Sequence, residues 1–193
     1  MIYIFCAFEA EARALIDSYK LAETQTEPFA LFANKEIQLI ISGMGQDRAK
    51  EAGHYLLSIC SIEKDDVLLN IGICAAQEEY HVGELLEIKS IQNEEVSYEL
   101  EPRSSGIKQV SCFSARQVLG KATPTDIAEM EALSLYEILK DSFLSENIGF
   151  LKIVSDNFNP FVPKKKFIIA LVQAHIKEIK AHIKTLQGED CVR

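Results

Sequence analysis

The sequence contains no long hydrophobic run. None of its apolar stretches approaches the ~20 residues that a helix needs to cross a bilayer, so we expect no membrane span and no membrane partner. The first eight residues are apolar, but they lack a basic start and run directly into Glu9 and Glu11, unlike a signal peptide. We therefore expect a cytoplasmic protein.

Positive charge is also scarce. The 193 residues include 20 Lys+Arg against 29 Asp+Glu, which gives a formal net charge of -9. A surface that binds nucleic acid needs a clustered basic face to displace counterions from the phosphates. The basic run Lys164-Lys165-Lys166 follows a proline and is more typical of a solvated helix start. We expect no nucleic-acid partner.

Cysteine and histidine offer no metal framework. The chain has five cysteines, an odd number, and none forms a C-x-x-C pair. Three of the five lie in strongly apolar stretches, as reduced core cysteines do. His175 and His182 are two helical turns apart, which is wider than the spacing of metal ligands on a helix, so we interpret both as structural. We expect no metal site and no cofactor.

The composition, 48% hydrophobic and 25% charged, is that of an ordinary globular domain, and we expect one domain over residues 1–193. A chain of this length buries roughly 70% of its unfolded surface. Short β-rich runs alternate with amphipathic helical patterns, which predicts an α/β sheet with helices on both faces. The expected strands are 2–7, 36–42, 66–72, 84–91, 107–113 and 150–155; the expected helices are 9–19, 47–62, 126–140 and 164–186, with a mobile loop at 92–106.

Three acidic residues stand at the ends of expected strands or on the helices that follow them, where ligands bind in open α/β sheets. Glu11 lies beside the apolar face of the first helix, and Glu131 lies four residues from both Ile127 and Leu135 on the buried side of another. Asp156 ends a strand. Taken singly, each is also compatible with a solvated edge or a turn. A buried carboxylate is costly unless a partner uses it, so together they indicate a site.

Two glycine-containing segments follow strands. In Ser42-Gly43-Met44-Gly45, Arg48 stands where G-x-G-x-x-G has its third glycine, so we expect neither a dinucleotide site nor a P-loop. We interpret Asn70-Ile71-Gly72-Ile73-Cys74-Ala75-Ala76 as a tight strand-to-loop turn. Cys74 follows its glycine by two residues, as in a nucleophile elbow, with His81 as a conceivable base. A buried, unreactive cysteine is the alternative interpretation.

Five segments occur in an order typical of one enzyme superfamily. They are Ala7-Phe8-Glu9-Ala10-Glu11, Ser42-Gly43-Met44-Gly45, Asn70-Ile71-Gly72-Ile73-Cys74-Ala75 with Val82-Gly83-Glu84 behind it, Glu129-Met130-Glu131-Ala132 and Val154-Ser155-Asp156. Through them the chain resembles the purine nucleoside phosphorylase/uridine phosphorylase superfamily. Within it, the chain is most similar to 5′-methylthioadenosine/S-adenosylhomocysteine nucleosidases. The resemblance implies a three-layer α/β/α fold with a central mixed, twisted sheet.

The resemblance also implies an activity, which is hydrolysis of the N-glycosidic bond of a purine nucleoside to a free base and a ribosyl sugar. By resemblance, Glu11 orients the attacking water and Asp156 is the acid that protonates the purine. Met130 and Glu131 match the pair that binds the ribose. The other residues expected to contact substrate are Glu129, Ile73, Ser155 and Lys152. The expected partner is a small-molecule nucleoside, of the methylthioadenosine or S-adenosylhomocysteine type.

The sequence departs from the family pattern at three places. Ile73-Cys74-Ala75 stands where the family usually has Ser-Ala-Gly, Lys152 stands where nucleosidases often have arginine, and the segment between Ile91 and Val110 is shorter. A shorter segment leaves the mouth of the pocket wide. We therefore expect a homodimer in which the neighbouring subunit helps to close it.

Three alternatives to a hydrolase are also compatible with the sequence. A phosphorylase needs cationic groups to hold phosphate, and Arg48 is the only plausible candidate. The second alternative is an enzyme of flavodoxin-like topology with Cys74 as nucleophile. The third is a catalytically silent member that binds a nucleoside without turnover.

Overall fold

A computed structural model describes residues 1–101, 106–159 and 163–188. The strands are β1 (Ile2–Cys6), β2 (Ala22–Gln25), β3 (Ala30–Ala33), β4 (Ile37–Ile41), β5 (Val67–Ala76), β6 (Leu85–Gln92), β7 (Ser97–Glu99), β8 (Lys108–Ser114), β9 (Ile127–Glu129) and β10 (Ile148–Asp156). The helices are α1 (Glu9–Tyr19), α2 (Gln46–Ile59), α3 (Ala132–Leu139), α4 (Lys165–Ala174) and α5 (Ile176–Leu186), with one 3-10 turn, η1 (Ser145–Asn147). In the ranges given above, none of the helices is long and apolar enough to cross a membrane.

Strand β5 is central because its nearly continuous apolar sequence can be buried on both faces. It pairs in parallel with β1 on one side and β10 on the other, as apolar strands of this kind typically do. The sheet order is β10-β6-β8-β9-β5-β1-β4-β3-β2, with β7 beside β6. Parallel and antiparallel pairs both occur, which confirms the predicted α/β class with a mixed sheet.

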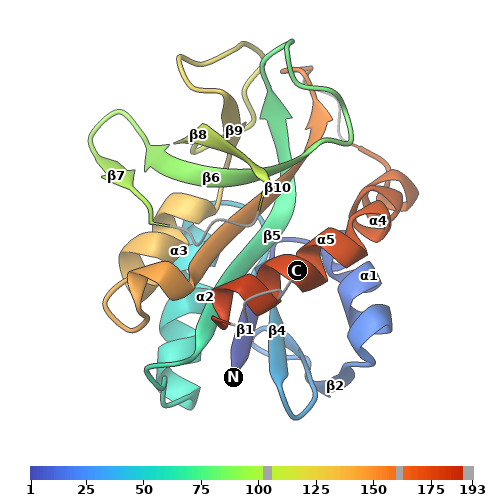
Figure 1. Cartoon of the computed structure of the whole chain (residues 1–193), viewed down its shortest axis with the longest axis vertical. Coiled ribbons are helices and arrows are strands. Elements are labelled where there is room, and N and C mark those ends of the chain that lie inside the picture. Colours follow the sequence, from blue (N-terminus) through green and yellow to red (C-terminus); the bar gives the residue numbers. More distant parts are fainter. Residues whose placement is uncertain (102–105, 160–162, 189–193) are drawn as a thin grey trace.

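One part of the sheet closes on itself. Strand β10 pairs with both β5 and β6, so β5, β9, β8, β6 and β10 form a closed ring of paired strands. In Figure 1 this ring lies above the parallel strands β1 and β4. Ring closure brings the carboxyl ends of β5, β9 and β10 together.

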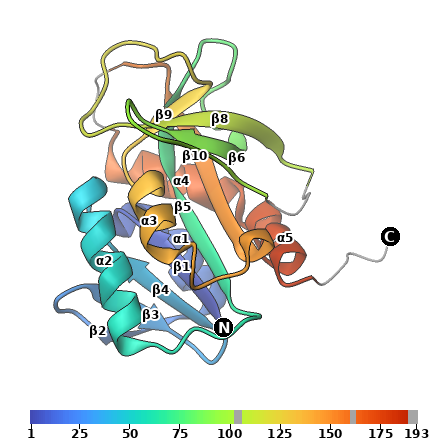
Figure 2. The same ribbon diagram turned by 90° about the vertical axis from the view of Figure 1, so that its left-hand side faces the viewer.

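The helices form two groups, each with its own hydrophobic core (Figure 2). Helices α2 and α3 pack together over a core that includes Leu56 and Leu135. Helix α1 packs against α4 and α5 over a second core that includes Leu15 and Val172. Helix α1 has the predicted bounds.

The predicted turn at 70–76 is wrong, because these residues lie inside β5. Its ladder with β10 continues as far as Ala75, which pairs with Asp156, and β9 pairs with the last two residues of the strand. Partners on both sides therefore keep the chain extended beyond Gly72. The predicted strand 66–72 is correspondingly too short.

The predicted helix at 126–140 begins too early. Residues Ile127–Glu129 form β9 between β5 and β8, and only Ala132–Leu139 is helical. The Asp126 carboxylate accepts hydrogen bonds from the backbone N–H and the hydroxyl of Ser111, 2.7 Å each, and so fixes the extended chain. The helical spacing between Ile127 and Leu135 was therefore coincidental.

The closing helix, predicted as 164–186, is two helices separated at His175. At His175 the backbone leaves the helical conformation, with φ -105° and ψ 9°, and the His175 ring lies 2.7 Å from the carbonyl oxygen of Gly83. The hairpin β2–β3 and strand β7 were not predicted. Strand β7 falls inside the expected loop 92–106, of which 102–105 lie outside the described residues.

Candidate active site

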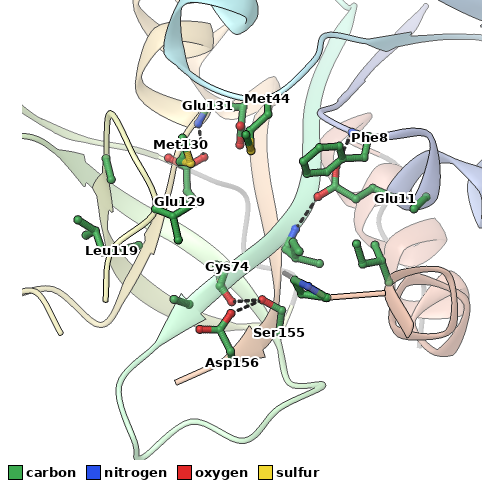
Figure 3. A pocket seen from close by; sticks show the side chains of 18 of the residues that line it. Phe8, Glu11, Met44, Cys74, Leu119, Glu129, Met130, Glu131, Ser155 and Asp156 are labelled. Carbon is green, nitrogen blue, oxygen red and sulfur yellow. Dashed lines mark hydrogen bonds between the residues drawn. The ribbon is translucent and has the colours of Figure 1, made fainter. Parts of the chain in front are cut away.

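A cavity of about 400 Å³ opens where β5, β9 and β10 end and where α1 and α3 begin (Figure 3). Strand pairing sets its walls, because Ala75 of β5 pairs with Ala128 of β9 on one side and Asp156 of β10 on the other. Of the eight residues predicted for the site, seven line this cavity. They are Glu11, Ile73, Glu129, Met130, Glu131, Ser155 and Asp156.

Glu11 lies in the first turn of α1 and is only 2% exposed. Its Oε2 accepts hydrogen bonds from the backbone N–H groups of Ala7, at 2.9 Å, and Phe8, at 3.0 Å. Its Oε1 accepts from the N–H of Ile73 at 3.0 Å. Burial raises the pKa of Glu11, although Lys152 and the backbone donors oppose the rise. A carboxylate of raised pKa is a better proton acceptor for an attacking water.

Gly72 lets the two charged side chains approach the strand. A Cβ atom there would lie 3.0 Å from Glu11 Oε1 and 3.4 Å from Lys152 Nζ. Any larger residue would therefore displace the carboxylate from its hydrogen bond to Ile73. This accounts for a glycine in the middle of a strand that otherwise favours apolar side chains.

We expect Gly72→Ala to lower the free energy of unfolding by about 1–3 kcal/mol, because the added methyl group overpacks a buried, charged contact. Urea denaturation measures this change. Gly120→Ala is the matched control, since a Cβ at Gly120 has nothing within 4 Å. Equal stability of the two variants would contradict the proposed close approach at Gly72.

Glu131 lies on the opposite wall of the cavity from Glu11 (Figure 3), at the N-terminus of α3, and is 7% exposed. Its Oε1 accepts a hydrogen bond from the Gly45 N–H at 2.7 Å. Gly43 and Gly45 have φ values of 84° and 94°, a region that favours glycine. The glycine turn thus aims a backbone donor at Glu131 and places Met44 on the cavity wall.

Beside Glu131, Glu129 and Lys152 form a buried ion pair. Lys152 Nζ lies 3.0 Å from Glu129 Oε2, and the two side chains are 1% and 0% exposed. Burial alone lowers the pKa of Lys152, but Glu129, Glu131 and Glu11 outweigh it and raise that pKa. One buried cation therefore faces three carboxyl groups.

Burial and the neighbouring Glu129 raise the pKa of Glu131 to about 7, with Lys152 opposing them. The folded state therefore binds more protons than the unfolded chain between the ordinary pKa of 4.5 and about 7. The stability from this group is complete below that window and is lost as the pH rises through it.

We expect Glu131→Gln to remove this loss. The free energy of unfolding of Glu131→Gln minus that of wild type should then be larger at about pH 8 than at about pH 5. Urea denaturation of both proteins at the two pH values measures the difference. A difference that is the same at both values would show that Glu131 does not titrate in this range.

Ser155 and Asp156 end β10 at the lower edge of the cavity in Figure 3. The Ser155 hydroxyl lies 3.0 Å from the Cys74 carbonyl oxygen and 2.8 Å from Asp156 Oδ2. Asp156 Oδ1 accepts a hydrogen bond from the Asn159 N–H at 3.0 Å. Asp156 is partly exposed, so a ligand in the cavity can reach its carboxyl group.

The fold has close structural relatives. A futalosine hydrolase of Helicobacter pylori strain 26695 superposes with a TM-score of 0.77 at 15% identity, over 95% of this chain and 97% of that one. A 5′-methylthioadenosine/S-adenosylhomocysteine nucleosidase from S. pneumoniae, with a transition-state inhibitor, gives 0.75 at 15%, over 96% and 99%. The Arabidopsis thaliana 5′-methylthioadenosine nucleosidase gives 0.77 at 12%, over 97% and 98%.

The chain has the nucleoside phosphorylase/nucleosidase fold. The predicted resemblance is thus confirmed in structure, over nearly the whole chain. In sequence, no protein-family model matches, and a comparison with curated proteins found no match.

Three candidate residues from the sequence, Lys152, Cys74 and His81, are either buried or outside the cavity of this nucleosidase fold. Lys152, expected to contact substrate, is buried beneath the cavity and does not line it. Cys74 borders the cavity but is 3% exposed, and burial strongly raises its pKa, which disfavours the reactive thiolate. His81 does not line the cavity.

Several cavity residues of the nucleosidase fold were not predicted as site residues. They are chiefly apolar and include Phe8, Met44, Val118, Leu119 and Ile168. Phe8 and Met44 lie inside the motifs given above. An apolar residue between two glycines, as Met44 is, could have indicated a residue of the cavity wall. Over 1–101, 106–159 and 163–188, no group of His, Cys, Asp and Glu side chains could hold a metal ion.

Proposed function

We propose that this protein is a nucleosidase that hydrolyses the N-glycosidic bond of a purine nucleoside of the methylthioadenosine or S-adenosylhomocysteine type. The observation that carries the proposal is that Glu11, Glu131 and Asp156, from three separate elements, converge on one cavity. Cleavage of this bond passes through a ribosyl cation. It needs an acid for the base, a carboxylate for the ribose hydroxyls and a proton acceptor for water.

Each carboxyl group then has one role. Asp156 donates a proton to the purine as the bond from C1′ to the base nitrogen breaks, and the base keeps the electron pair. Glu131, with the backbone at Met130, accepts hydrogen bonds from the ribose hydroxyls. Glu11 orients a water molecule, whose oxygen bonds to C1′ while Glu11 takes its proton. The proton balance is restored when Asp156 is reprotonated and Glu11 releases its proton.

Charge in the cavity favours water over phosphate as the nucleophile. The described lining has five acidic residues, Glu9, Glu11, Glu129, Glu131 and Asp156, and Lys165 as its one basic residue. Glu129 is paired with the buried Lys152 and Asp156 holds the proton that it donates, so Glu9, Glu11 and Glu131 leave the lining acidic. A phosphate dianion is repelled by such a surface, whereas neutral water is not.

Arg48, the candidate phosphate ligand, is engaged elsewhere. Its guanidinium lies 4.6 Å from the centre of the Phe29 ring and makes a 2.7 Å ion pair with Glu51. It is not among the residues that line the cavity. This placement supports the hydrolase over the phosphorylase.

The apolar part of the cavity supports a substrate whose 5′ carbon carries an apolar thioether rather than a phosphate. Phe8, Met44, Val118 and Leu119 all border it. Base release from methylthioadenosine, S-adenosylhomocysteine, futalosine, adenosine and adenosine 5′-monophosphate tests the proposal. We expect release from methylthioadenosine, S-adenosylhomocysteine or both, and none from the monophosphate. Calorimetric binding without release from any member would instead support a silent nucleoside binder.

We also propose a homodimer in which the second subunit closes the cavity mouth. Three exposed apolar residues border the cavity, namely Phe8 (37%), Met44 (51%) and Val118 (60%), and apolar residues gathered in this way are typical of covered surfaces. We expect light scattering after size exclusion to give twice 21.6 kDa. A fully active monomer would refute the closure, and an inactive monomer would favour the silent binder.

A further inference from the structure

The pair Glu129–Lys152 is not used by the mechanism above, yet it is the most deeply buried charged contact near the cavity. Both side chains are essentially inaccessible. Glu129 Oε1 is buried with no hydrogen-bond partner, whereas Oε2 accepts from three donors. A buried carboxylate oxygen without a hydrogen-bond partner costs stability, so we infer that this pair serves a purpose other than stability.

We propose that Glu129 and Lys152 are positioning residues that fix the Glu131 carboxyl group and set how readily it ionises. The inference rests on the proposed function, in which Glu131 binds the ribose. Neither member of the pair needs to touch the substrate. Both act through Glu131.

The positioning follows from the donors on Glu129 Oε2. It accepts hydrogen bonds from the backbone N–H groups of Glu131 and Ala132, each at 2.8 Å, as well as from Lys152 Nζ at 3.0 Å. These bonds tie the end of β9 to the start of α3. Lys152 donates to the same oxygen from β10, which is separated from β9 by β5 in the ring. The backbone that carries Glu131 is therefore held from two elements.

The control of ionisation follows from charge. Glu131 faces the like charges of Glu129 on β9 and Glu11 on α1, and the cation of Lys152 on β10. Cys112 on β8 also lies near enough to Glu131 for the Glu131 charge to affect the pKa of the Cys112 thiol. The Gly45 N–H before α2 donates to Glu131 and favours its ionised form. Removing the charge of Glu129 leaves Lys152 to favour ionised Glu131, so Glu131 must then titrate at lower pH.

Carbon-detected NMR of protein labelled with ¹³C-glutamate measures this titration directly, without substrate. The Glu131 carboxyl signal is the one that Glu131→Gln removes. In Glu129→Gln, which keeps an acceptor oxygen, we expect the midpoint of Glu131 to fall by about one unit or more. In Lys152→Arg, which keeps the cation, we expect a midpoint close to wild type. An unchanged or raised midpoint in folded Glu129→Gln overturns the proposal.

If Glu129→Gln fails to fold because Lys152 is left without its partner, the double variant Glu129→Gln/Lys152→Met removes both charges. Glu129 is hydrogen-bonded directly to the Glu131 backbone, whereas the described contact of Lys152 is with Glu129, so removal of both charges should still lower the midpoint, by less than in the single variant. An unchanged or raised midpoint in this variant also overturns the proposal.

The NMR experiment and the base-release assay test different claims, so either claim can be wrong while the other holds. If the Glu131 titration shifts but no nucleoside releases its base, the positioning role of Glu129 and Lys152 stands and the ribose-binding role of Glu131 is wrong. If base is released but the Glu131 titration does not shift, the nucleosidase activity stands and Glu129 and Lys152 do not control the ionisation of Glu131.

Discussion

Replacing Asp156 by asparagine should lower the rate of base release by about 100- to 10,000-fold, the usual contribution of a general acid. The amide is nearly the same shape and can still accept the hydrogen bond from the Asn159 N–H. It has no transferable proton for the departing purine. Chromatographic measurement of the free base, with circular dichroism as a check on folding, gives the result.

Asp141→Asn is the matched control for this variant, because Asp141 is exposed and lies outside the cavity. We expect it to retain the wild-type rate. If Asp156→Asn retains more than about a tenth of the wild-type rate, Asp156 is not the acid. The proton would then have to come from another group.

The second large effect is expected for Glu131→Gln, with kcat/KM falling by about 10- to 150-fold, the value of a hydrogen bond to a charged group. The free energy of unfolding should stay level or rise near neutral pH, because the amide avoids the cost of a buried charge. Steady-state kinetics and urea denaturation together separate activity from stability.

Glu137→Gln, on the exposed side of the same helix, is the control and should change neither quantity. Unchanged kinetics in Glu131→Gln, accompanied only by a higher melting temperature, would reduce Glu131 to a structural residue. The ribose role would then be lost, although Asp156 and Glu11 could retain theirs.

The parts of the fold that local sequence determines were predictable. Helix α1 has an apolar stripe and an acidic first turn, and its bounds match the prediction. Strand β9 was not predictable in this way, because its extended form depends on Ser111, β5 and β8, which are distant in sequence. Ring closure through β10 depends on equally long-range pairing.

The candidate site also contains residues that local sequence identified and residues whose places depend on long-range contacts. Glu131 was selected for a position on a helical stripe, whereas it precedes the helix and is held by Gly45 from another part of the chain. Motif order identified it nonetheless. The burial of Lys152 beneath the cavity was not predictable, since its direction depends on how β10 packs beside β5. Spacing located the charged residues, but tertiary contacts decide which of them face the cavity.

The central claim is that water, held by Glu11, replaces the base at C1′. Its most direct test is the rate of base release from the best nucleoside of the panel, with and without inorganic phosphate, together with the identity of the sugar product. We predict the same rate in both conditions and a free sugar in each. Release that requires phosphate, with a sugar 1-phosphate as the product, would contradict the account.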